Sequence, residues 1–564
     1  MTAGASGEEV IAVIRNESSV RGSFEAAVAA LAILGVVWLT WTVRPLLSVG
    51  TAGNDALFLA DGARRIAAGQ IPHVDFPLPV GSLPYFAWHW AEVRLAPIPP
   101  FVGMHLLIFL ALVPLVAAAG EVMSRPAMLA LVAVAAMGAL APFNLTITDP
   151  QSIAFHGAYN RFAAVAALVW LAWLFSARRV TMLGGGLVIA WTAGFLIAVK
   201  FVFLGVVIGP LVVLGAVRGD LRRASAFGAM LVAAGLALVE MRSGAVSGYV
   251  GDVRGLAAVN EGRIVHLAAS FVYKWIVPVA LVAAAIGWRA IEAWRSVAAD
   301  AGIGRRMAAV AEPAALAAAL AGIVVGESQS TGGLEITAVL GLALTPALLP
   351  QRPTMVRIAL VAGLIGLVGG ELVANTVRKS LYVAMARQGP LVPMPLAETY
   401  LGRVGVPAEM LKRAQDLAAL WTGAPETMRR LEGEGRDYVP LDYDRYLAQW
   451  VTVAEALAAI PAQEKTRLGV VSTLTMADLF GLALAAPPAA GHHLAFDPGR
   501  TVAPMSAAAA AAYVATVDTV FEPTCAIADG RPGKSVVPWF RAVLAERHRA
   551  SVLTACWTMH RRIR

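Results

Sequence analysis

Apolar runs alternate with short polar turns over residues 25–375, and a different pattern follows. A helix that crosses the hydrocarbon core of a bilayer needs about 20 mostly apolar residues. On this criterion the hydropathy pattern predicts an α-helical polytopic membrane protein with about eleven transmembrane helices. The predicted spans lie near residues 25–45, 100–121, 127–143, 162–177, 181–199, 201–217, 224–240, 271–288, 308–326, 336–350 and 357–375.

Residues 376–564 mix polar and apolar positions as soluble domains do. Residues 406–421 and 446–460 repeat apolar side chains at helical spacing, and the alanine run at 507–512 fits a plain helix. The segments LGVVST, VATVDTVF and SVLTACW are short and rich in β-branched residues, and they predict strands. Strands that alternate with helices predict a small C-terminal α/β domain.

Composition supports a membrane protein. Hydrophobic residues make up 58% of the chain and charged residues 15%, whereas soluble domains contain about 25% charged residues. We attribute the formal net charge of +8 to membrane topology, because no nucleic-acid-binding motif is present and the short turns on one side are basic. These turns carry Arg125, Arg178, Arg179, Arg218, Arg222, Arg223, Arg289, Arg295, Arg305, Arg306, Arg352 and Arg357.

The positive-inside rule places these basic turns and the N-terminus in the cytoplasm. Residues 1–24 are then a cytoplasmic segment. Residues 25–375 form the membrane module, with a first extracytoplasmic loop at 46–99, and residues 376–564 form an extracytoplasmic domain. The first apolar run lacks a small-residue cleavage site, so we predict a retained anchor in a bacterial inner membrane.

The first loop is rich in ionisable residues. Residues 53–86 contain three aspartates, two arginines and a histidine. Their sequence is GNDALFLADGARRIAAGQIPHVDFPLPVGSLPYF. Asn54 is a good N-cap and Gly69 a typical helix stop, so residues 55–68 predict an amphipathic helix at the membrane surface. Prolines then break the chain, and a second interfacial helix rich in aromatic residues leads into the next span.

Each aspartate of this loop has a structural and a functional interpretation. Asp55 is either a partner of the helix dipole or, because the preceding asparagine can cap the helix, a free carboxylate at the membrane surface. Asp61 is expected to pair with Arg64 and Arg65, three and four residues further on. Asp75 lies in a proline-rich turn and is either a turn-forming residue or a site residue.

This stretch resembles the first extracytoplasmic loop of GT-C glycosyltransferases, integral membrane enzymes that include the protein mannosyltransferase and aminoarabinose transferase group. The order of first loop, multi-span body and extracytoplasmic tail is also similar. His73 stands where many relatives have an aromatic residue, and Asn54–Asp55 where they have two acids, so the sugar and the subfamily stay open. The matching positions are Asp55, Ala63, Gly69, Pro72, Asp75, Phe76, Pro79, Gly81, Leu83 and Tyr85.

The resemblance implies an inverting transferase that moves a sugar from undecaprenyl or decaprenyl phosphate to an extracytoplasmic glycan, lipid or protein acceptor. The departing phosphate is a stable leaving group, so the reaction needs a base and cations but no general acid. Asp55 matches the proposed base of the family. Some GT-C enzymes use a divalent cation, but no ligand set in this sequence demands a metal.

The phosphate and the sugar need further contacts. Lys200, between two apolar runs, either snorkels to the interface or meets an anion. The segment HGAYNRF, with His156, Tyr159 and Arg161, is either an interfacial anchor or a donor head-group site. The other candidate substrate-binding residues are Arg64, Arg65, His73 and Asp75.

Four residues of the tail raise questions of redox state and metal binding. The only cysteines, Cys525 and Cys556, are too few for a disulfide scaffold. On the oxidising side of the membrane they form either one disulfide or two buried free thiols. His492 and His493 have no acid or cysteine at ligand spacing, so a solvated loop is expected there.

Two other functions fit parts of the pattern. A transporter or flippase of envelope lipids also carries charges within the membrane, as Lys200 and Glu371 do, but it usually has internal repeats, which this sequence does not show. A non-catalytic subunit of an envelope glycan assembly complex needs no catalytic carboxylate. The loss of Asp55 discriminates between this subunit and an enzyme.

Overall fold

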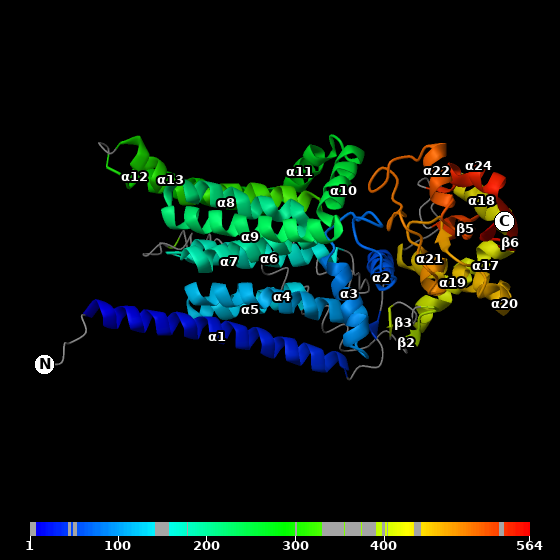
Figure 1. Cartoon of the computed structure of the whole chain (residues 1–564), viewed down its shortest axis with the longest axis horizontal. Helices are drawn as coiled ribbons and strands as arrows, with labels where there is room; N and C mark the ends of the chain where they lie inside the picture. Colours follow the sequence, from blue (N-terminus) through cyan, green and yellow to red (C-terminus); the bar gives the residue numbers. More distant parts are fainter. Residues whose placement is uncertain are drawn as a thin grey trace.

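The protein is an elongated molecule with a helical bundle at one end and a smaller domain of helices and strands at the other (Figure 1). A computed structural model describes residues 7–42, 47–48, 53–140, 157–177, 179–298, 302–329, 355, 374, 391–396, 401–402, 404–433, 442–529 and 535–563. Helix α1 begins at the end of the bundle that is distant from the C-terminal domain, and α2 lies next to that domain.

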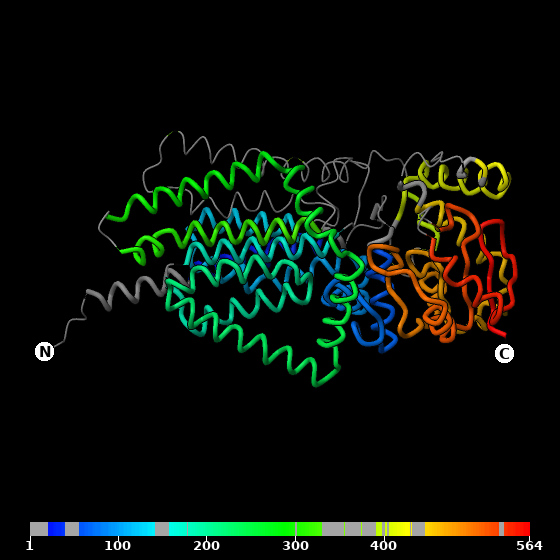
Figure 2. The backbone as a smooth tube through the Cα atoms, turned by 90° about the horizontal axis from the view of Figure 1, so that it is seen from above, coloured from blue at the N-terminus to red at the C-terminus, as the bar shows by residue number. Residues whose placement is uncertain are grey.

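Apolar helices run along the long axis of the bundle (Figures 1 and 2). Among the described residues, seven segments are long and apolar enough to cross a membrane, which agrees with the predicted polytopic membrane protein. The helices of the bundle are α1 (Gly7–Thr42), α4 (Pro100–Val122), α5 (Arg125–Leu140), α6 (Ala158–Ser176), α7 (Met182–Lys200), α8 (Leu204–Val217), α9 (Gly219–Ser243), α12 (Ile276–Arg295) and α13 (Ile303–Ser328).

The segment from Met182 to Val217 is continuous in hydropathy but folds back on itself. Helix α7 ends at Lys200, whose extended backbone (φ −158°, ψ 95°) interrupts the helix before the short 3₁₀ turn η1 (Phe201–Phe203). Arg218, just after α8, donates a hydrogen bond to the carbonyl of Ala177, just before α7, at 3.0 Å. The two helices are therefore antiparallel, as the two predicted spans on either side of Lys200 require.

One predicted span is shorter than expected, and two are not tested. Helix α5 has 16 residues and is shorter than a full bilayer crossing. The predicted spans near 336–350 and 357–375 lie outside the described residues, as does Glu371.

Small residues allow the bundle helices to approach each other closely. A Cβ atom on Gly322 of α13 would lie 2.7 Å from the backbone of Gly205 in α8, and one on Gly22 of α1 would lie 2.5 Å from the carbonyl oxygen of Gly120 in α4. Helix association within a lipid environment depends on such close backbone packing, because burial of apolar side chains gives little advantage there.

Four shorter helices lie at the end of the bundle that faces the C-terminal domain: α2 (Gly53–Ala67), α3 (Leu83–Arg94), α10 (Ala245–Val259) and α11 (Arg263–Lys274). Helix α2 ends as predicted, because Gly69 adopts φ +84° and its N–H bonds the carbonyl of Ile66. The helix predicted to lie at the membrane surface is largely enclosed by protein. Side chains on several sides of it are buried, because α3 and the C-terminal helices α19 and α21 pack against it.

The C-terminal domain contains two small sheets. In the larger sheet the strand order is β4-β5-β7-β6, with β4 parallel to β5 and the other pairs antiparallel; in the smaller it is β1-β3-β2. The strands are β1 (Leu47–Ser48), β2 (Leu391–Pro393), β3 (Val404–Pro407), β4 (Val471–Thr473), β5 (Thr519–Pro523), β6 (His548–Thr554) and β7 (Trp557–Arg562). Because β1 follows α1 directly and pairs with β3, the domain is joined to the start of the first loop.

Helices surround these strands, as the predicted small domain with a sheet requires. They are α17 (Ala408–Gly423), α18 (Pro425–Gly433), α19 (Asp442–Ala459), α20 (Ala462–Lys465), α21 (Leu479–Ala483), α22 (Ala507–Val514), α23 (Ala526–Asp529) and α24 (Val537–Arg547). The predicted strand at 514–521 starts only at Thr519, because α22 includes Val514. The predicted strand at 551–557 is a hairpin, with β6 and β7 on either side of Ala555 and Cys556.

Cys525 and Cys556 form a disulfide, with their Cα atoms 4.7 Å apart. The bond ties the residue before α23 to the turn between β6 and β7. Disulfides persist in oxidising compartments and are rare in the bacterial cytosol. Of the two alternatives for these cysteines, the structure shows the disulfide and not the two free thiols. The bond supports an extracytoplasmic position for this domain.

Candidate functional site

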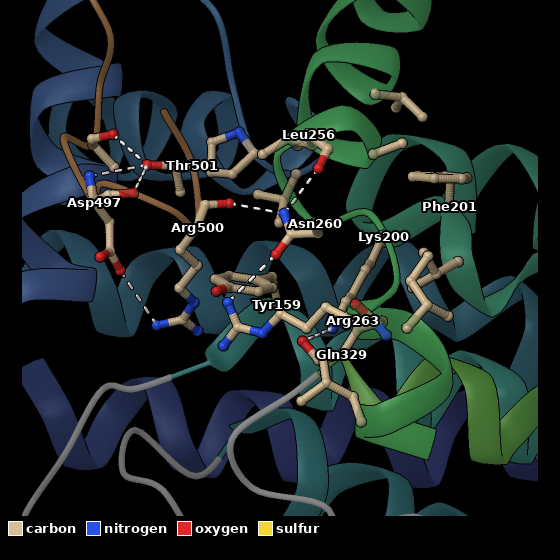
Figure 3. A pocket seen from close by; sticks show the side chains of 18 of the residues that line it. Tyr159, Lys200, Phe201, Leu256, Asn260, Arg263, Gln329, Asp497, Arg500 and Thr501 are labelled. Atoms are coloured by element: carbon tan, nitrogen blue, oxygen red, sulfur yellow. Dashed lines mark hydrogen bonds and ion pairs between the residues drawn. The ribbon is translucent and has the colours of Figure 1, made fainter. Parts of the chain in front are cut away.

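A cavity of about 390 Å³ lies where the bundle meets the C-terminal domain. Its walls come from the first loop, α6, the turn between α7 and α8, the α10–α11 turn, the end of α13 and the C-terminal segment around Asp497 (Figure 3). Phe58 of α2 and Val80 form part of the apolar wall. The cavity therefore joins segments that are far apart in the sequence, and it combines apolar and cationic surface.

Lys200 is the most deeply buried cation of this cavity, with 7% of its surface exposed. Its Nζ donates a hydrogen bond to Asn160 Oδ1 and contacts the carbonyl of Gln329 at 3.4 Å. The ammonium also lies 5.9 Å from the ring centre of Tyr159 and 5.6 Å from that of Phe203. The structure thus places two predicted residues, Lys200 and Tyr159, on one cavity.

The α10–α11 turn supplies a cation that sequence reasoning did not assign to the site. Arg263 begins α11 and lines the cavity, and its Nη1 lies 3.4 Å from Asn260 Oδ1. The φ of +73° at Gly262 allows the chain to turn between these two residues. On the same helix Val265 and Tyr273 expose 77% and 82% of their surface, a composition typical of a helix at a lipid interface.

The C-terminal domain supplies another unassigned cation. Arg500 lines the cavity, and its Nη1 lies 3.6 Å from Asp497 Oδ2. In the sequence the segment DPGRT has only the appearance of a turn, and more than 230 residues separate Arg500 from Asn260 and Arg263. No local signal could therefore have placed the two arginines together.

Arg64 and Arg65, both predicted substrate contacts, join the first loop to the C-terminal domain. Both pair with Asp61, at 2.5 and 3.0 Å. Arg64 also pairs with Asp478 at 2.7 Å, and Arg65 donates to the carbonyl of Ala489 at 2.8 Å. Burial opposes ionisation of Asp61, but the charges of Arg65 and Arg64 outweigh it and hold the pKa of the carboxyl below its ordinary value. The expected pairing of Asp61 is confirmed.

Two other candidates of the first loop shape the loop itself. Asp75 accepts a hydrogen bond from the N–H of Ile71 at 2.6 Å, the contact expected of a turn-forming aspartate. His73 has a positive φ of 67°, and its Nδ1 lies 2.7 Å from Asp252 Oδ2 on α10. Asp252 also accepts from the N–H of Leu78, so it binds the loop at two points.

The remaining predicted residues are placed differently. Asp55 lies in the first turn of α2, but its side chain is outside the described part of the structure, and His156 is outside it entirely. Arg161, on α6, is buried with 2% of its surface exposed and does not line the cavity. His492 is not in a solvated loop: it is buried and stacks on Tyr513 with ring centres 3.4 Å apart. Burial lowers the pKa of His492 to about 3, so the ring is neutral.

Among the residues that the structure describes, no group of three or more His, Cys, Asp or Glu side chains could hold a metal ion. A second cavity, of about 620 Å³, lies between α7, α8 and α9 and is lined almost entirely by aliphatic residues.

Searches with protein-family models, against curated proteins and against solved structures find no match to this chain.

Gly81, one of the positions that resemble GT-C loops, fixes the first loop against the end of α7. Its N–H bonds the carbonyl of Val199 at 3.1 Å, and a Cβ atom there would overlap the carbonyl groups of Ile197 and Ala198. These residues directly precede Lys200. The glycine therefore has a packing role that brings the loop to the cavity.

Replacement of Gly81 by alanine is expected to lower the free energy of unfolding by about 1–3 kcal/mol, because the added methyl group must displace backbone atoms. The measurement is thermal unfolding of the purified protein in nanodiscs. Gly194→Ala, on α7 and with no atom within 4 Å of the added Cβ, is the matched control and should unfold like wild type. Equal stability of both variants would show that the loop does not depend on this contact.

Proposed function

We propose that the protein is a bacterial glycosyltransferase of the GT-C type, which transfers a sugar from a polyprenyl-phosphate carrier to an extracytoplasmic glycan, lipid or protein acceptor. The observation that carries the proposal is the cavity at the junction of the bundle and the C-terminal domain. Lys200, Arg263 and Arg500 line it together with aliphatic and aromatic side chains. A site of this composition suits an amphiphile with an anionic head group.

The position of the cavity supports a lipid-linked donor. It lies at the end of apolar helices that are long enough to cross a membrane, and α11, with exposed apolar side chains, forms one wall. A phosphate at the depth of the lipid head groups could reach Lys200 from this side. A water-soluble nucleotide sugar would gain nothing from the apolar wall.

The chemistry requires one base and several cations. The acceptor hydroxyl attacks the anomeric carbon, and the bond from that carbon to the phosphate oxygen breaks with its electron pair left on the phosphate. We propose that Asp55 is the general base that accepts the proton of the hydroxyl. Asp55 belongs to the first-loop helix α2, which reaches the cavity through Phe58. The cations stabilise the negative charge that grows on the phosphate. Attack opposite the leaving group inverts the anomeric carbon.

The arrangement of charges supports an extracytoplasmic site in the inner membrane. Arg125, Arg218 and Arg305 lie in or beside turns at the end of the bundle that is distant from the C-terminal domain. By the positive-inside rule this end faces the cytoplasm. The cavity and the disulfide-bonded domain then face the oxidising side, where polyprenyl-phosphate sugars are used.

The experiment that tests the proposal offers the purified protein in nanodiscs a panel of polyprenyl-phosphate sugars, with nucleotide sugars as matched donors. Extracts of the host envelope supply acceptors, and release of polyprenyl phosphate is measured. Acceptor-dependent release from at least one lipid-linked donor, and none from nucleotide sugars, is the expected result. Movement of labelled lipid across liposome membranes without cleavage would instead indicate a transporter or flippase.

A further inference from the structure

We infer that Arg500 of the C-terminal domain is a phosphate-binding residue of the donor cavity, and that Asn260 positions it together with Arg263. The inference rests on the proposed function and extends it: the C-terminal domain completes the donor site and is more than a cap or a module for the acceptor. The ligand is a phosphate ester carried on a polyprenyl chain.

The loop that carries Arg500 is held in one conformation by its own hydrogen bonds. Thr501 Oγ1 donates to the carbonyl of Ala495 at 2.7 Å and accepts from the N–H of Asp497 at 3.0 Å. The N–H groups of Arg500 and Thr501 both donate to the carbonyl of Asp497, and Gly499 has the positive φ that this turn needs. The turn thus fixes the direction in which the Arg500 side chain leaves the backbone.

Asn260 joins this loop to the membrane bundle (Figure 3). Its Nδ2 donates to the carbonyl of Arg500 at 3.0 Å and to that of Leu256 at 2.8 Å. Its Oδ1 faces Arg263 Nη1 at 3.4 Å. One side-chain amide therefore contacts both arginines, one through its backbone and the other through its guanidinium group, and holds them on the same wall of the cavity.

The weak contact of Arg500 with its carboxylate partner allows its side chain to move to a ligand. Among the described lining residues, three are cations and one, Asp497, is an acid. The contact of Arg500 with Asp497, at 3.6 Å, is longer than the roughly 2.7–2.9 Å of a charge-assisted hydrogen bond. The Arg500 side chain is 41% exposed and that of Asp497 only 4%, so water can solvate the guanidinium when it leaves the carboxylate.

The reaction provides a reason for this arrangement. A polyprenyl-phosphate sugar is a phosphodiester with one negative charge, and the released monoester carries about −1.5 to −2 at neutral pH. A guanidinium that exchanges a loose carboxylate contact for the phosphate supplies its charge as the second negative charge develops. Interactions that strengthen in this way towards the transition state accelerate the reaction.

The test measures binding of polyprenyl phosphate to the full-length protein in nanodiscs, with the uncharged polyprenol as a second probe. Arg500→Gln is expected to weaken binding of the phosphate about 10- to 100-fold, the usual effect of losing a hydrogen bond between charged groups. Binding of polyprenol should not change. Arg549→Gln, on the exposed part of strand β6, is the matched control and should bind both probes like wild type.

Two more variants separate the role of the charge from that of the fold. Arg500→Lys keeps the charge and should recover part of the affinity for the phosphate. Asn260→Ala removes no charge, so weaker binding of the phosphate with unchanged binding of polyprenol would show that Asn260 positions the arginines. Thermal unfolding of each variant confirms that the domain remains folded.

The outcomes distinguish this inference from the proposed function. If wild type binds polyprenyl phosphate and Arg500→Gln binds it equally well, the role of Arg500 is overturned and the transferase proposal stands. If wild type prefers polyprenol or binds neither probe, the proposed function fails, and the inference fails with it.

Discussion

Replacement of Asp55 by asparagine is expected to reduce sugar transfer by about 10²- to 10⁴-fold, the usual contribution of a general base. Asparagine has nearly the same shape and keeps the hydrogen-bonding ability of the side chain, but it cannot take the proton of the acceptor hydroxyl. The polyprenyl-phosphate donor should still bind, because the cations of the cavity are unchanged. The measurement is the rate of polyprenyl phosphate release with saturating donor.

Asp416→Asn is the matched control for this variant. Asp416 lies on α17 with its side chain 62% exposed, and its ion pair with Lys412 is at the surface, so its loss should leave transfer unchanged. If Asp55→Asn retains full activity, the base lies elsewhere. If wild type has no activity with any donor while complexes for envelope glycan assembly fail without the protein, the non-catalytic subunit is the better description.

Local patterns in the sequence predicted much of the fold. Gly69 ends α2 because its φ is positive, as the predicted glycine stop requires. The start is less exact, because α2 begins at Gly53, one residue before the asparagine that was expected to cap it. The pairing of Asp61 with Arg64 and Arg65 also followed from spacing along one helix. Lys200 was visible because a lysine between two apolar runs is costly in a membrane.

The composition of the cavity could not be predicted in the same way. Arg263 and Arg500 belong to turns whose local sequences resemble ordinary solvated turns, and only the docking of the C-terminal domain brings them together through Asn260. The same docking explains why α2 is buried and is not a free surface helix. Hydropathy describes how each segment meets water or lipid, and it contains no information about a contact between segments that are hundreds of residues apart.

The docking of the two parts depends on a small group of buried charges. Asp61, with 1% of its surface exposed, holds Arg64 and Arg65, and these donate hydrogen bonds to the carbonyls of Ala486 and Ala489 in the C-terminal domain. Each partner alone would be a buried charge without compensation, which is far less favourable than the complete group. The first loop and the C-terminal domain are therefore expected to separate or unfold together when one member is removed.

Replacement of Asp61 by alanine should lower the free energy of unfolding by about 3–5 kcal/mol, because it leaves the buried Arg65 without its only carboxylate among the described contacts. Asp416→Ala removes an exposed ion pair and should change stability by no more than about 1 kcal/mol. The measurement is thermal unfolding in nanodiscs, combined with limited proteolysis of the C-terminal domain. Wild-type resistance of Asp61→Ala to both would show that packing alone holds the domain.

The same carboxylate gives a dependence on pH whose sign is fixed by its pKa. The folded protein holds the pKa of Asp61 below its ordinary value of 3.8. The stabilisation is therefore complete above that value and is lost as the pH falls through the lower pKa of the folded state. Wild type and Asp61→Asn should differ most in stability at neutral pH, and their curves should converge as the solution is made strongly acidic. Arg500 reaches the cavity only while the domain is docked. Asp61→Asn should therefore also lose binding of polyprenyl phosphate, although Asp61 does not line the cavity.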